Sequence, residues 1–124
     1  MRWLVALVFA SSFTAAIAAA GFPPGTPDYV KIYPGGQIIY AAPNETNNNI
    51  RIHYTSAATM DQIAAFYDRD AITAGLKKQP DNVPPPADMR MILYFISNHH
   101  GFLNIDLARR PDGLTQVNLL YSRH

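Results

Sequence analysis

One stretch of this chain, residues 59–76, carries a complete set of helix signals, and the segments around it alternate like strands. Thr59, followed three residues later by Gln62, predicts a capping box, and Asp61 complements the positive end of the helix. Five apolar residues recur at three- and four-residue steps and predict one apolar face: Ile63, Phe66, Tyr67, Ala71 and Ala74. Gly75 supplies a left-handed stop. Because a single helix covers only one face of a sheet, few layered folds fit.

Five segments have the alternation and composition of strands. Residues 37–42 and 50–55 predict a hairpin, and residues 90–98, 102–109 and 114–122 predict an antiparallel meander because short turns join them. The first strand of the meander is apolar on both sides, which is typical of a central strand covered on both faces. We therefore expect a two-layer α+β domain of order ββαβββ, with one helix packed on an antiparallel sheet of about five strands.

The first 20 residues predict a secretory signal peptide. Arg2 precedes an uncharged run from Trp3 to Ala20, which ends in three small residues suited to cleavage. An uncleaved membrane anchor is the alternative, but hydroxyl residues and alanines dilute the second half of a run that is already short for crossing a bilayer. The sequence thus predicts export to the periplasm or beyond the cell, with no membrane contact after cleavage.

The exported part of the chain should be neutral and free of disulfides. Cysteine is absent, which excludes a disulfide framework, a thiolate nucleophile and a Cys-ligated metal. Ten basic residues face nine acidic ones, and Arg2 leaves with the signal, so capture of nucleic acid or an anionic membrane is not expected. Residues 21–34 predict an extended Pro-rich leader, and residues 35–124 a single α+β domain.

The strands and helix carry residues that match a recurrent pattern: Tyr33-Pro34-Gly35, then Thr55-Ser56, then Phe66-Tyr67, then Ala74-Gly75. This pattern resembles that of small bacterial exported or periplasmic domains of unknown function. The resemblance covers roughly residues 33–122, and Leu76 stands where that group usually has Trp. It implies the fold derived above and no catalytic residue.

The sequence contains no recognisable catalytic set, and we expect no enzyme, cofactor or metal. None of the four histidines lies in a His-Glu-x-x-His motif, and neither Ser56 nor Ser97 lies on a nucleophile elbow. The adjacent His99 and His100 are expected to be exposed residues of a turn. The alternative is that they form a weak, opportunistic metal site.

The sheet face turned away from the helix is the candidate binding surface. The alternation places polar residues there, and we expect Ile92, Tyr94 and Ile96 to form an apolar stripe within that frame. The candidate binding residues are Arg51, His53, Tyr94, Phe102, Asn104 and Asp106. Tyr40, by contrast, is expected to face the core. Tyr94→Asp should then abolish association and leave the helix intact. The alternative is that the leader or the Pro-rich loop covers this face.

The function that the sequence favours is a non-enzymatic, exported interaction or accessory module, which binds a protein partner or itself through that face. An inhibitor or an immunity protein fits the same description. The alternative is a small-molecule-binding or hydrolytic domain with a pocket where His53, Tyr94 and Asp106 converge. A purely structural envelope protein is the third hypothesis.

Overall fold

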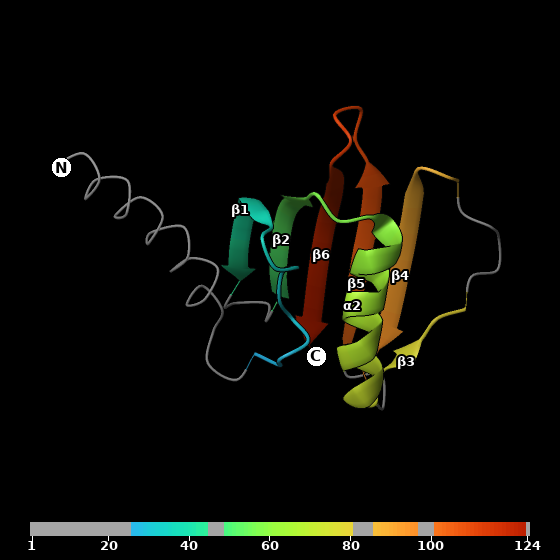
Figure 1. Ribbon diagram of the computed structural model, residues 1–124. Coiled ribbons are helices and arrows are strands. Elements are labelled where there is room, and N and C mark those ends of the chain that lie inside the picture. Colours follow the sequence, from blue (N-terminus) through green and yellow to red (C-terminus); the bar gives the residue numbers. More distant parts are fainter. Residues whose placement is uncertain (1–25, 45–48, 81–85, 97–100, 124) are drawn as a thin grey trace, which may run out of the picture.

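The computed structural model describes residues 26–44, 49–80, 86–96 and 101–123, and within them one helix packs on one face of a six-stranded antiparallel sheet (Figure 1). The expected α+β class and its two layers are therefore confirmed. The predicted signal peptide, the tip of the first hairpin, the centre of the Pro-rich loop and the His99-His100 turn lie outside the described residues.

The elements follow one another along the chain as β1 (Gln37–Asn44), β2 (Asn49–Ser56), α2 (Met60–Thr73), β3 (Lys77–Lys78), β4 (Met89–Phe95), β5 (Gly101–Arg109) and β6 (Thr115–Arg123). In the sheet their order is β1-β2-β6-β5-β4-β3, and all neighbours are antiparallel.

The expected count of five strands and the order ββαβββ need correction. After Gly75 the chain turns back along the edge of β4, where Lys77 pairs with Phe95 and Lys78 with Tyr94. The N–H of Gln79 then donates to the carbonyl of Leu93 at 2.8 Å. This short β3 is the sixth strand and forms one edge of the sheet. Strand β4 is therefore second from that edge and is not the central strand that the sequence predicts.

The helix begins and ends where the sequence predicts. The Thr59 hydroxyl accepts from the N–H of Gln62 at 3.1 Å, and the Gln62 side chain accepts from the N–H of Thr59 at 2.9 Å. These contacts satisfy two backbone donors that a helix start leaves without partners. Gly75 adopts a φ of 88°, and the N–H of buried Leu76 closes the last turn onto Ala71.

The core lies between the helix and the inward residues of β2, β6, β5 and β4. The inward set matches the predicted alternation in the first three of these strands, and every member is buried: Ile50, Ile52, Tyr54, Leu103, Ile105, Leu107, Val117, Leu119 and Tyr121. The helix adds Ile63, Ala64, Tyr67 and Ala71. Burial of this apolar surface is the main force holding the two layers together.

Residues 26–34, the described part of the predicted leader, pack in the helix layer and contribute to the core. Tyr29 and Val30 are buried, and the Tyr29 ring meets Tyr121 edge-on with 6.2 Å between centroids. Burial raises the pKa of Tyr29 to about 12. Lys31 forms an ion pair with Asp70 of α2, and this hydrogen bond lowers the pKa of the Asp70 carboxyl. The described part of the leader thus lies on the helix side of the sheet.

A chain of tyrosine hydrogen bonds joins this segment to both layers. The Tyr67 hydroxyl donates to the carbonyl of Lys31 at 2.6 Å, so the Tyr54 hydroxyl must donate to Tyr67, also at 2.6 Å. The N–H of Tyr33 in turn donates to Tyr54 at 3.1 Å. Burial raises the pKa of both phenols. Each buried hydroxyl therefore has its partners, as a stable interior requires.

Candidate interaction face

The sheet has an outer face, turned away from α2, that no described helix or strand covers. Strand register arranges its residues in rows across β1, β2, β6, β5 and β4. The first row consists of Tyr40, His53, Asn118, Asp106 and Met91, and the second row of Ala42, Arg51, Leu120, Asn104 and Leu93. Neighbours in a row are close enough to interact or to contact one ligand together.

Five of the six predicted binding residues lie on this outer face: Arg51, His53, Phe102, Asn104 and Asp106. Arg51 is exposed and the other four are partly buried. Asn104 donates to Asp106 at 3.3 Å. No ion pair among the described residues engages any of the five.

The prediction that Tyr94 lies on the outer face is wrong, because Tyr94 and its alternate neighbours in β4 face the core instead. Tyr94 pairs with Leu103 and Ile92 pairs with Ile105, so both side chains join the inner face. Tyr94 has no exposed surface, and its hydroxyl donates to Asp68 of α2. Burial, followed by that hydrogen bond, raises its pKa. Since Tyr94 lies on the other side of the sheet, the pocket predicted from His53, Tyr94 and Asp106 does not form.

The apolar stripe on the outer face consists instead of the other side of β4: Met89, Met91, Leu93 and Phe95. Met89 and Met91 are 55% and 62% exposed. Both sides of this strand are apolar, so the sequence pattern alone does not show which side faces the core.

Tyr40 lies at the opposite border of the outer face and is also misplaced by the sequence analysis. A β-bulge between Ile38 and Tyr40 inserts Ile39, which turns Tyr40 away from the core. The Tyr40 ring is 50% exposed and packs on the His53 ring at 5.5 Å between centroids. Large apolar groups therefore border the outer face on both sides, with polar residues between them.

Three buried side-chain oxygens in the described part of the chain have no hydrogen-bond partner, and all three belong to outward residues of the sheet: Asn49, Asp106 and Asn118. An unpartnered buried acceptor destabilises a fold by about 1–3 kcal/mol. These three oxygens are shielded from solvent, and the described chain supplies no donor for them.

A shallow pocket of about 420 Å³ opens on the outer face between β4, β5 and β6. Exposed Met89 and Met91 form its apolar wall, and Ala108, Asp106 and Asn118 lie beside them. A pocket with an apolar wall and two nearby oxygens suits a side chain that is apolar along its length and polar at its tip.

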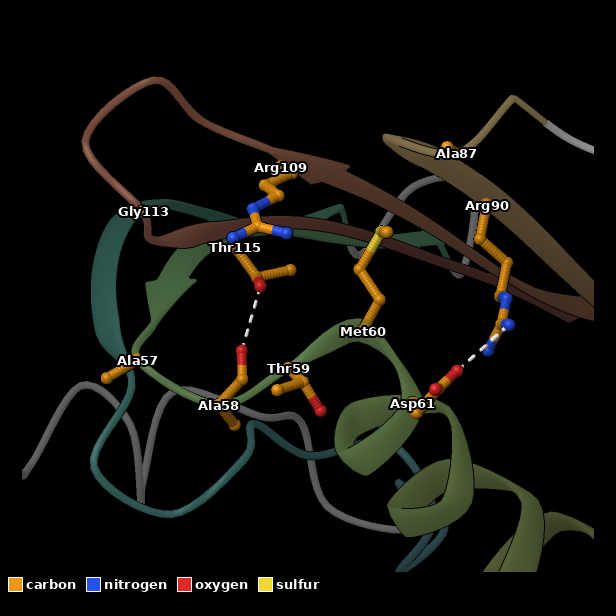
Figure 2. Close-up of a pocket in the computed structure, with 10 residues that line it drawn as sticks. All are labelled: Ala57, Ala58, Thr59, Met60, Asp61, Ala87, Arg90, Arg109, Gly113 and Thr115. Atoms are coloured by element: carbon orange, nitrogen blue, oxygen red, sulfur yellow. Dashed lines mark hydrogen bonds and ion pairs between the residues drawn. The ribbon is translucent and has the colours of Figure 1, made fainter.

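A second pocket, of about 360 Å³, lies at the start of α2 (Figure 2). Arg90 forms an ion pair with Asp61 at 3.0 Å. Figure 2 shows Met60 between Arg90 and Arg109. The Thr115 hydroxyl donates to the carbonyl of Ala58 at 2.8 Å. These contacts connect the start of the helix to the sheet. Asp61 already neutralises the guanidinium group of Arg90.

Neither a metal site nor a membrane span is found in the part of the chain that the structure describes. No group of three or more His, Asp or Glu side chains there could hold a metal ion. The described helix is too short and too polar to cross a bilayer.

No family model, no curated protein and no solved structure matches this chain.

Proposed function

We propose that this chain is an exported accessory module, which works by packing its outer face against a β-sheet of a protein partner. The observation that carries the proposal is that exposed apolar groups border one uncovered sheet face on both sides, with polar residues between them. Export is supported by the signal-like residues at the start of the chain.

A sheet is the partner that this surface fits. Its rows present apolar groups at both borders and polar groups between them at strand spacing, and side chains of two such faces interdigitate when sheets pack about 10 Å apart. A small-molecule site has less support, because the described pockets are shallow and the three groups expected to converge lie on opposite faces.

A photo-crosslinking amino acid placed at Met91 tests the proposal in the cell envelope. We expect a single adduct of defined mass that unlabelled protein competes away. The matched control is Ile72, which is 53% exposed on α2 and should give no adduct. A second probe at Phe95, on the same side of β4, repeats the test. Equal labelling from Met91 and Ile72, or no adduct from either Met91 or Phe95, would refute a role for the outer face.

A further inference from the structure

We infer that the partner sheet is the outer face of a second copy of this chain, related by a two-fold axis that runs along β6. The inference deepens the proposed function and depends on it. An interface between identical copies must be complementary to itself, so each contact appears twice.

The outer face meets this requirement because β6 is the middle strand of β1-β2-β6-β5-β4. Rotation about an axis along β6 places β2 of one copy over β5 of the other, and β1 over β4. In the first row, His53 then faces Asp106 of the second copy, Tyr40 faces Met91, and Asn118 faces itself. The row is thus complementary to its own rotated image.

Charge supports this arrangement. The donors Arg51 and His53 both project from β2, whereas Asp106 projects from β5 beside Asn104. Rotation brings the donors of one copy over the acceptors of the other. Asp106 and Asn118, which lie opposite His53 and Asn118 of the second copy, each hold a buried oxygen without a partner in the described chain. A two-fold axis across the strands would instead place Arg51 over His53, so that donors face donors.

Shape supports it as well. Tyr40 protrudes at one border of the outer face, and the pocket of about 420 Å³ beside Met89 and Met91 opens at the other. In the inferred dimer the Tyr40 ring of one copy enters the pocket of the second copy, and its hydroxyl approaches the polar groups there. Rings that bury an apolar body and bond through a polar tip are frequent anchors of protein interfaces.

The available area predicts a weak, reversible dimer. Five strands of about eight residues, at about 4.8 Å between strands and 3.3 Å per residue, present roughly 500 Å² per copy. The total of about 1,000 Å² lies at the lower limit for a specific interface. We therefore expect dissociation in the micromolar range.

Sedimentation equilibrium of the purified chain tests the inference. We expect concentration-dependent dimers. His53→Asp places two carboxylates opposite each other and Asp106→His places two imidazoles there, so each variant loses the donor–acceptor pair and should weaken association about tenfold or more. The double variant, which exchanges the two residues, should restore affinity to within about threefold. Asp28→His makes the same chemical change at an exposed residue on the helix side and should change nothing.

The outcomes separate this inference from the proposed function. A chain that stays monomeric at all concentrations, and yet gives a Met91 adduct of foreign mass, refutes the dimer and leaves the accessory module standing. Dimers that neither single variant weakens, or that the exchange does not restore, also refute the inferred contact. Unchanged circular dichroism and melting of each variant confirm that only association is being measured.

Discussion

Replacing Tyr94 by Asp is expected to unfold the domain, and not to release a partner from a folded one. The side chain is completely buried between the sheet and α2. Loss of a buried aromatic ring costs about 3–5 kcal/mol. The new carboxylate would also lie near Asp68, whose only ion-pair partner among the described residues, Lys78 at 3.3 Å, is already engaged. One of the two carboxylates would therefore lack a cation, and an uncompensated buried charge adds about 3–5 kcal/mol. Together these match the whole stability of a typical domain, about 5–15 kcal/mol.

Urea denaturation followed by circular dichroism measures this effect, with Tyr94→Phe as the matched control. The control keeps the ring and loses only the hydrogen bond to Asp68, so we expect a loss of about 1.5–3 kcal/mol and a cooperative transition. A native-like, cooperative Tyr94→Asp variant would contradict the placement of Tyr94 on the inner face.

Gly101→Ala should give the second largest loss of stability, about 3 kcal/mol or more. Gly101 begins β5 with a φ of 144°, which L side chains rarely adopt. A Cβ there would lie 2.1 Å from the carbonyl oxygen of Ser122 and 3.0 Å from the Cα of Arg123. Both are backbone atoms of the paired strand β6, so relief would require the two central strands to separate.

Gly113→Ala is the control for backbone conformation alone. Gly113 also has a positive φ, 86°, but a Cβ there would meet nothing within 4 Å. We expect a loss of about 1–2 kcal/mol. Thermal melting of both variants separates the cost of the backbone conformation from the cost of steric overlap. Equal losses of stability in the two variants would show that β5 and β6 are not as close as described.

Those parts of the fold whose two sides differ in polarity could be predicted from the sequence. The capped helix is specified by Thr59 and Gln62, and the inward residues of β5 and β6 by strict alternation. The inward side of β4 could not be predicted, because Met91 and Ile92 on its two sides are both apolar. Only pairing with β5 decides which of them is buried.

Long-range contacts explain the remaining differences. The bulge at Ile39 turns Tyr40 outward, and periodicity cannot reveal one inserted residue. Tyr29 joins the core through Tyr121, which is far away in the chain. Five of the six candidate binding residues lie on the sheet face expected from the sequence, because their strands alternate clearly. Their arrangement in rows follows from strand order, which local patterns do not encode.

The most direct test of the self-complementary outer face is cross-linking through single cysteines, because the natural chain has none. Gln116 is an outward residue of β6, so Gln116→Cys should lie close to its own counterpart and be joined by a short bis-maleimide into a covalent dimer. Met91→Cys, exposed on the same face, should lie about four strand spacings, roughly 19 Å, from its counterpart and remain monomeric. Dimers from Met91→Cys but not from Gln116→Cys, or from neither, would contradict the account.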